Sequence, residues 1–268
     1  MTPPKSVYKY EPFSLQAISN LKSAILYFGS PLDFNDPFDC AINAPLAELT
    51  DDDVELVRST FLSDESVPEH HRAATAKMSI PMLREQIASG AQRAIDAEKE
   101  SFLKTKGVSC FSQNNDNLLM WSHYADCYRG FCLEFNTECD PFDKLQPVEY
   151  VSEFPRISTL DIGLNKQHGD VVKKLFCTKS DDWSYEEEWR VIHAKQRQTY
   201  GYGNALTGVY FGPRMTDQNI DLICLILYSQ MPEVKLYRGS KSSAEFRVTF
   251  EELGPYLPYA EAKRRDLV

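Results

Sequence analysis

The stretch GVSCFSQNNDNLLMWSHYADCYRGFCLEF, residues 107–135, contains the change of pattern that decides the fold. Its two ends, residues 108–112 and 130–135, are short apolar runs that predict β-strands. Residues 116–127 between them have the spacing of a helix. Strands separated by irregular connections and a few helices do not give the regular rhythm of a doubly wound parallel sheet. We therefore expect an α+β fold with a mixed or antiparallel sheet at its core.

Similar short β segments occur on both sides of this stretch. We expect further strands at residues 8–10, 148–151, 187–194, 208–211, 234–238 and 246–250. The spacing of apolar residues predicts helices at 168–178 and 216–228, and Ser14 is placed to cap another helix near the N-terminus.

Residues 46–106 form a segment of different composition, rich in Ala, Glu, Gln, Lys and Arg from residue 68 onward. Thr50 and the three aspartates after it predict a capping box at the start of a helix. Pro81 suits the first turn of a later helix, and Gly107 suits its end. We expect a single domain over residues 1–268, with a helical insertion at about 46–106 that lies outside the functional site.

The charge of the chain limits its partners. The 39 acidic residues exceed the 29 basic residues, which gives a net charge of −10. This charge repels phosphate backbones and anionic lipid surfaces, so we expect neither a long nucleic acid nor a membrane as a partner. A small nucleotide ligand is compatible with it, because two or three basic residues can hold a diphosphate locally.

The compartment follows from hydropathy and cysteine usage. No stretch approaches about 18 consecutive apolar residues, and the first ten residues are polar and contain proline. The seven cysteines are odd in number and mostly lie in apolar runs, as buried reduced thiols do. These features predict a cytoplasmic protein without disulfides.

The common enzyme fingerprints are missing from the sequence, including Gly-rich phosphate loops, G-x-S-x-G and H-E-x-x-H. His123 and Cys127 have the four-residue spacing that allows shared metal ligation, but no second pair at ligand spacing follows. We therefore expect no metal site.

Three segments combine aromatic residues with polar groups. FNDPF, residues 34–38, is a turn that is either structural or part of a ligand site. In residues 120–126, Trp121 and Tyr124 share a helical face, while His123 lies off it, either at the surface or at a cleft.

The third segment is WSYEEEWRVI, residues 183–192. If it enters a strand, Glu186, Glu188 and Arg190 project to one face, because side chains alternate along a strand. Two carboxylates beside an arginine suit a site that stabilises a cationic transition state. The same residues also suit an exposed ion pair at the start of a strand.

At these segments the chain resembles, along nearly its whole length, the bacterial domain-of-unknown-function family 2971. The shared features are Tyr8-Lys9-Tyr10, FNDPF, Met120-Trp121 with His123-Tyr124, Gly130-Phe131 and the block at 183–190.

More distantly, the chain resembles ADP-ribosyltransferases of the split-sheet type, which order their site as an early Arg or His on a strand, a Ser-rich strand start and a Glu preceded by another polar residue at a two-residue offset; here Tyr8 to Tyr10, Ser109 to Ser112 and Glu186-x-Glu188 stand in that order. The resemblance implies cleavage of the nicotinamide–ribose bond of NAD, with Glu188, Glu186 and His123 as catalytic residues. It implies that NAD is bound by Tyr8, Lys9, Tyr10, Phe34, Asn35, Asp36, Ser109, Ser112, Trp121, Tyr124 and Arg190.

Two other functions fit the same residues. The first is a non-enzymatic protein that binds a ligand or partner, in which Glu186, Glu188 and Arg190 form an ionic network that holds the FNDPF loop. The second is a metal-dependent nuclease or hydrolase that uses Asp36 with the two glutamates.

Overall fold

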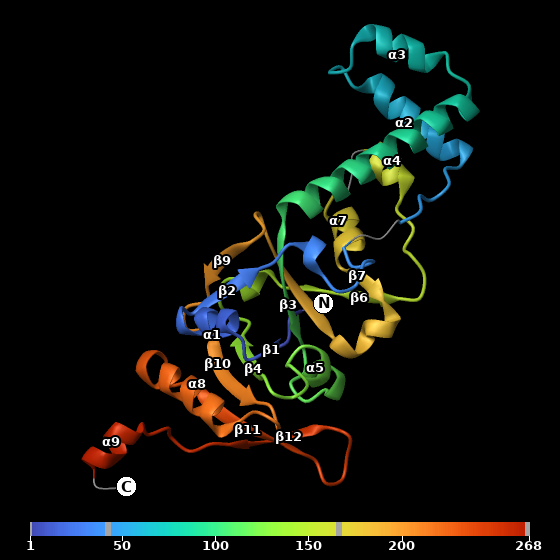
Figure 1. The fold of residues 1–268 in the computed structure, drawn as a ribbon. Coiled ribbons are helices and arrows are strands. Elements are labelled where there is room, and N and C mark those ends of the chain that lie inside the picture. Colours follow the sequence, from blue (N-terminus) through green and yellow to red (C-terminus); the bar gives the residue numbers. More distant parts are fainter. Residues whose placement is uncertain (1, 41–43, 165–167, 266–268) are drawn as a thin grey trace. The chain divides into compact units, whose positions relative to one another are not determined.

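A computed structural model describes residues 2–40, 44–164 and 168–265 (Figure 1). The chain divides into two compact units, each built from separate segments. The sheet unit comprises Met1–Ser30, Gly107–Val148 and Asp182–Val268, and the helical unit comprises Pro31–Lys106 and Glu149–Asp181. The expected insertion at 46–106 thus lies inside a larger unit that also includes a later part of the chain.

The sheet unit is organised around an eight-stranded sheet with the order β12-β11-β10-β4-β1-β3-β8-β5. In this sheet β10 and β11 pair in parallel, and the other described pairs are antiparallel. The strands are β1 (Ser6–Glu11), β3 (Gly107–Ser112), β4 (Phe131–Asn136), β5 (Gln146–Pro147), β8 (Glu188–His193), β10 (Leu206–Phe211), β11 (Lys235–Lys241) and β12 (Val248–Glu252). The expected α+β fold with a mixed sheet is confirmed.

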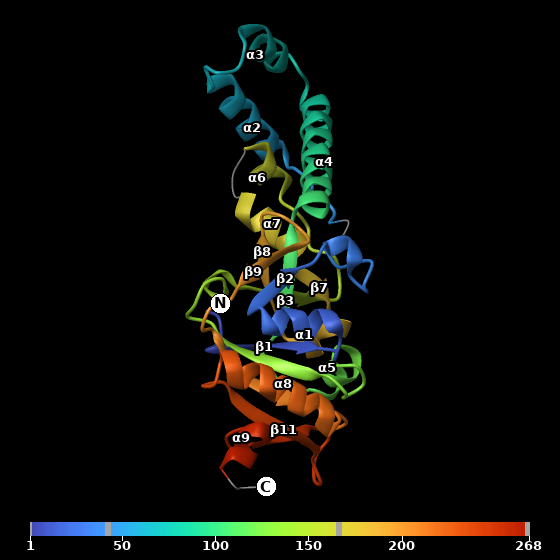
Figure 2. The same ribbon diagram turned by 60° about the vertical axis from the view of Figure 1, so that its left-hand side comes forward.

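Helices cover the two faces of this sheet differently. Helices α1 (Leu15–Lys22) and α8 (Asp217–Gln230) pack on one face in a core of aliphatic and phenylalanine side chains. Figure 2, in which this side is brought forward, shows both helices in front of the strands of the sheet. The other face holds α5 (Leu118–His123) and a core that is rich in tyrosine. The polar groups of the candidate site lie on this second face.

Side chains cap the helices where the sequence indicates. The Ser14 hydroxyl accepts a hydrogen bond from the Ala17 amide at the start of α1, and Asn117 accepts from Leu119 and Met120 at the start of α5. Helix α5 is shorter than the expected 116–127: it begins after the Asn117 cap and ends at His123, and residues 126–128 beyond it adopt left-handed backbone angles. The expected helical face of Trp121 and Tyr124 therefore ends with the helix.

A small second sheet in this unit was not expected from the sequence. It pairs β2 (Ile25–Phe28) with β9 (Gln198–Gly201). The remaining elements are the short 3₁₀ helices η2 (Phe142–Lys144) and η3 (Asp181–Glu186) and the terminal helix α9 (Tyr259–Arg264).

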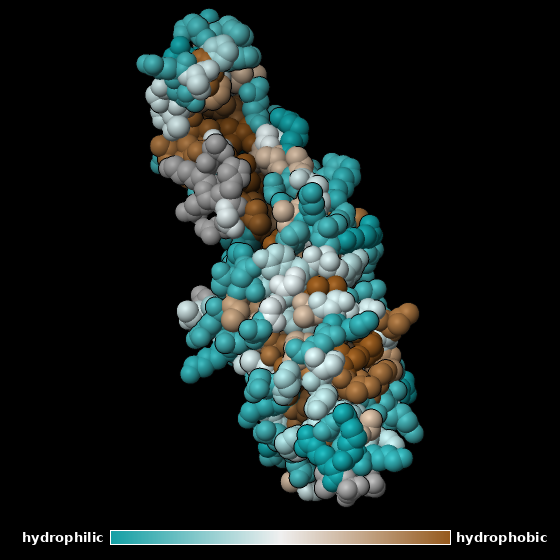
Figure 3. Space-filling view, turned by 90° about the vertical axis from the view of Figure 1, so that its left-hand side faces the viewer, coloured by the Kyte–Doolittle hydropathy of each residue, from teal (hydrophilic) through white to brown (hydrophobic). Residues whose placement is uncertain are grey.

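The helical unit contains α2 (Asp51–Ser63), α3 (Glu69–Ala76), α4 (Ile80–Thr105), α6 (Thr159–Gly163) and α7 (His168–Phe176), with the short 3₁₀ helix η1 (Pro31–Asp33) and a parallel pair of strands, β6 (Glu149–Val151) and β7 (Thr178–Ser180). The capping box expected at Thr50 is present. Leu49, Val54 and Leu83 form a small core. Figure 3 shows apolar side chains gathered along α2 and α4 at the top of the view.

Gly130 lies in the turn that joins α5 to β4, where backbone atoms leave no space for a side chain. A Cβ atom at Gly130 would lie 2.2 Å from the Glu11 carbonyl oxygen and 3.0 Å from that of Ala125. We expect Gly130→Ala to lower the free energy of unfolding by about 3 kcal/mol, because backbone must move to admit the methyl group. Gly254→Ala is the matched control, since a Cβ there meets nothing within 4 Å. Equal stability of the two variants in urea denaturation would contradict this prediction.

Candidate functional site

Three polar side chains form one row across three neighbouring strands. Ser112 on β3 pairs with Tyr8 on β1 and with Glu188 on β8. Adjacent strands lie about 4.8 Å apart, and directly paired residues point to the same face. The row continues on the other side of β1 with Glu134, which pairs with Tyr8. We call the row of Tyr8, Ser112 and Glu188 the polar row.

Glu188 is held by an arginine from its own strand. The Arg190 Nε and one terminal guanidinium nitrogen donate to the two carboxylate oxygens of Glu188, at 2.7 and 2.9 Å. Glu188 is 5% exposed and Arg190 is fully buried. A bidentate pair of this kind fixes the orientation of the carboxylate and offsets part of the desolvation of both charges.

Glu186 does not share the strand face expected from its spacing. It ends η3, before β8 begins, and Glu187 between them has a φ of 43°, which interrupts the alternation of side chains. The Glu186 carboxylate instead accepts a hydrogen bond from the Tyr124 hydroxyl. The contact joins the end of η3 to the residue that follows α5, and both the Glu186 and the Glu188 carboxylates are buried.

Aromatic rings surround the polar row on the α5 side. Trp121 is fully buried, and its ring meets Tyr10 edge-on with centroids 5.2 Å apart. The Trp121 indole donates to the Asn115 carbonyl at 2.7 Å, and the Tyr10 hydroxyl donates to the Asn114 carbonyl at 2.8 Å. These contacts fix the loop after Ser112 and the position of α5. Trp121 and Tyr10 are core residues that form the base of the site.

His123 lies at the exposed end of α5. Its ring is 6.3 Å from that of Tyr185, and the Asn117 side chain donates to the Tyr185 carbonyl at 3.1 Å. His123 is therefore near the segment that leads into Glu186. Tyr185 and Tyr124 are half-buried beside it.

Lys9 and Ser109 lie on the opposite face of the sheet from the polar row. The alternation along β1 and β3 places them there, and Lys9 lies over the Phe111 ring and forms an ion pair with Glu11. The Ser109 hydroxyl is buried and has no hydrogen-bond partner within the described part of the chain. The structure thus brings Tyr8, Tyr10, Ser112, Trp121, Tyr124, Glu186, Glu188 and Arg190 together, and it separates Lys9 and Ser109 from them.

A cluster of tyrosines around Glu134 was missed in the sequence. The hydroxyls of Tyr210 and Tyr8 donate to the two Glu134 oxygens, at 2.9 and 3.5 Å, and the rings of Tyr210 and Tyr237 stack at 4.5 Å. Burial, with the Glu134 charge next, raises the pKa of Tyr8 to about 12. The alternation of side chains along β4 could have indicated this cluster, because it places Glu134 and Cys132 on the same face of the sheet as Tyr8.

The FNDPF loop belongs to the helical unit. Asp36 is buried and accepts a hydrogen bond from the Phe38 amide at 2.9 Å, whereas Asn35 is exposed. A pocket of about 430 Å³ is lined by Asp36 and Phe38 with Phe154 and Lys179 among others. Phe34 and Asn35 are not among its lining residues.

Comparison with known proteins supports the resemblance to the family of unknown function. The model of that family, DUF2971, described as a protein of unknown function, matches residues 120–191. The match covers most of α5, all of β4 and the segment with Glu186, Glu188 and Arg190. No curated protein and no solved structure matches the chain.

Three further observations concern metal binding, membrane-spanning helices and the cysteines. Within residues 2–40, 44–164 and 168–265, no group of three or more His, Cys, Asp or Glu residues is placed to hold a metal ion. None of the helices there is both long enough and apolar enough to cross a membrane. The cysteines at positions 40, 110, 127, 132, 139, 177 and 224 are all free thiols.

The pair of Glu188 and Arg190 predicts an asymmetric response to mutation. We expect Arg190→Gln to lower the free energy of unfolding by about 3–5 kcal/mol, because a buried carboxylate loses its cation. The double variant Glu188→Gln/Arg190→Gln should recover most of this loss, because neutral amides can hydrogen-bond without a buried charge. Urea denaturation of both variants measures the difference. A double variant as unstable as Arg190→Gln would contradict this account of the pair.

The raised pKa of Tyr8 predicts a loss of stability at alkaline pH. The tyrosine reference pKa is near 10, so the folded protein holds this proton more tightly than the unfolded chain. The contribution of this Tyr8 proton to the free energy of unfolding is complete below about pH 10. It is lost as the pH rises through about 12. In the parent protein, the unfolding free energy should fall as the pH rises above 10. In Tyr8→Phe this fall should be less steep, by up to about 1.4 kcal/mol per pH unit, which is the limit for one proton. Denaturation curves between pH 9 and 12 test this, and an unchanged slope would refute it.

Proposed function

We propose that the protein is an NAD-cleaving enzyme similar to ADP-ribosyltransferases, with Glu188 as its key carboxylate. The observation that carries the proposal is the polar row. The three segments that the resemblance orders along the sequence lie on the neighbouring strands β1, β3 and β8, and Tyr8, Ser112 and Glu188 are paired directly across them. Residues 8, 112 and 188 reach one face of one sheet only because of this register.

The chemistry needs a carboxylate where positive charge develops. In the proposed reaction the bond between the nicotinamide nitrogen and the ribose carbon breaks, and its electron pair leaves with nicotinamide. The ribosyl group becomes cationic in the transition state and is captured by the oxygen of water or of an acceptor, which then loses a proton. A carboxylate near the ribose hydroxyls stabilises this charge, and its effect is larger where water is excluded.

Each polar group near the row has a role in this proposal. Arg190 holds the Glu188 carboxylate in one orientation, so the group is preorganised. Glu188 would accept hydrogen bonds from the ribose hydroxyls. Glu186, bonded by Tyr124, would orient the attacking nucleophile. Half-buried Tyr8 would contact the departing ring at the edge of the site.

A non-enzymatic binding protein of the same fold is the second candidate function. The observation that favours it is the ion pair itself, because Arg190 already binds both oxygens of the Glu188 carboxylate. Under this proposal the pair stabilises the fold, and the tyrosine-rich face serves to bind a ligand. The two functions differ in whether the Glu188 charge is needed for turnover.

We expect the full-length protein to release nicotinamide from NAD, either alone or with an added acceptor. Glu188→Gln should lower the rate at least about a hundredfold, because it removes charge stabilisation from the transition state and keeps the side-chain shape. Liquid chromatography of the released nicotinamide, with NAD in excess, gives the rate. Glu187→Gln is the matched control: Glu187 is exposed, adjacent to Glu188 and bonded to Asn114, and this variant should retain activity within about threefold.

Stability is separated from catalysis by two further variants. Glu188→Asp keeps the charge but moves the carboxylate back by one carbon, and Glu188→Gln/Arg190→Gln removes both charges of the pair. We expect circular dichroism to show that both variants are folded. We expect both to release nicotinamide at least about tenfold more slowly than the parent protein. Absence of turnover in the parent protein, or full activity in a folded Glu188→Gln variant, would overturn the enzymatic function.

A further inference from the structure

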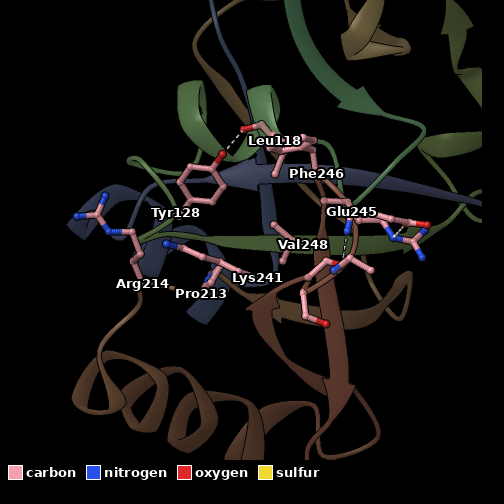
Figure 4. A pocket seen from close by; sticks show the side chains of 12 residues that line it. Leu118, Tyr128, Pro213, Arg214, Lys241, Glu245, Phe246 and Val248 are labelled. Atoms are coloured by element: carbon pink, nitrogen blue, oxygen red, sulfur yellow. Dashed lines mark hydrogen bonds and ion pairs between the residues drawn. The ribbon is translucent and has the colours of Figure 1, made fainter.

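A groove of about 580 Å³ lies in the sheet unit, apart from the polar row. It is bounded by the start of α5, by the turn after β10 and by the connection between β11 and β12. Its lining residues are Leu118, Tyr128, Pro213, Arg214 and the segment from Lys241 to Val248. Figure 4 shows these side chains around one opening. A volume of several hundred Å³ is typical of a small-molecule site.

The floor and rim of the groove are apolar and aromatic. Leu118 and Val248 form part of the floor, and the Tyr128 ring is fixed because its hydroxyl donates to the Leu118 carbonyl at 3.0 Å. Phe246 is 97% exposed at the rim, on the connection between β11 and β12. A phenylalanine left almost wholly in water beside a groove offers a flat surface for stacking.

Positive charge gathers at one end of the same groove. In Figure 4, Lys241 extends toward Tyr128, and Arg214 lies on the same side. Within the described residues neither Lys241 nor Arg214 has an ion pair or a side-chain hydrogen bond, whereas Arg247 is paired with Glu245 at 2.7 Å. Lys241 therefore points into this opening without an ion pair among the described residues, and Arg214, whose charge also acts on Asp126, adds positive charge at the same end of a groove in a chain whose net charge is −10.

We propose that this groove binds a nucleoside diphosphate. A ligand that fits must carry a flat ring for Phe246 or Tyr128 and concentrated negative charge for Lys241 and Arg214. A nucleoside diphosphate has both, and its diphosphate is small enough to be held by two or three basic residues. An acidic peptide offers the charge but spreads it over several residues, which two cations at one end of a groove match less well.

The groove is distinct from the polar row, and the proposal does not depend on NAD cleavage. Tyr8, Ser112 and Glu188 are not among the residues that line the groove. Binding at the groove can therefore be measured without any turnover.

The experiment is a titration of the full-length protein with ADP by isothermal calorimetry at low ionic strength. We expect Lys241→Ala to weaken ADP binding at least tenfold and Phe246→Ala about threefold or more. Lys235→Ala, on the same strand, and Tyr259→Ala, an exposed aromatic on α9, are the matched controls and should bind as the parent does. Adenosine and inorganic pyrophosphate should each bind more weakly than ADP.

Photo-crosslinking with 2-azido-ADP then locates the bound nucleotide. We expect the labelled peptide to include residues 241–248 or Tyr128. The proposal is overturned if ADP does not bind at millimolar concentration, if the groove variants bind it as the controls do, or if the label maps only to other segments. Binding of a poly-glutamate peptide in place of ADP would also overturn it. Because nicotinamide release is measured separately, failure here leaves the proposed function unaffected, and the reverse also holds.

Discussion

The register of β3 between β1 and β8 is the constraint on which the candidate site depends. Ser112 faces Tyr8 on one side and Glu188 on the other, so three distant parts of the chain contribute to one face. A slip of one residue would send one set of side chains to the opposite face of the sheet. Such a slip would expose Phe111 and Trp189 on the tyrosine-rich side, so the packing of the aliphatic core maintains the register.

Trp121 on α5 packs against the sheet and so fixes the position of the helix. Its indole contacts Tyr10 and Phe250 while donating to the Asn115 carbonyl, and it leaves almost no exposed surface. The helix is too short to be stable alone, so its position comes from this packing and from the Asn117 cap. The contact between Tyr124 and Glu186 then follows from the position of the helix, because Tyr124 directly follows α5.

Local signals in the sequence predicted most of the fold. The capping residues Ser14 and Thr50 and the apolar runs of β3 and β4 are short-range features, and each appears in the structure near its expected boundaries. The pairing of β2 with β9 was not predicted, because it joins segments far apart in the sequence.

The site was only partly predictable for a related reason. Alternation along a strand places Glu188 with Arg190 and separates Lys9 from Tyr8, and both could be inferred once the strands were located. The left-handed backbone at Glu187 could not be inferred, because a non-glycine residue gives no sign of it in the sequence. That residue separates Glu186, at the end of η3, from Glu188, at the start of β8.

The division into two units has a topological consequence. The chain leaves the sheet unit after Ser30 and returns at Gly107, and Gly29 and Val108 are joined there by two backbone hydrogen bonds, at 3.1 and 3.0 Å. The exit and re-entry points are thus already adjacent, so a short loop could close the gap at little entropic cost. The pairing of Gly29 with Val108 therefore sets no limit on the length of the segment between them, and the strand register on either side of this junction is independent of it.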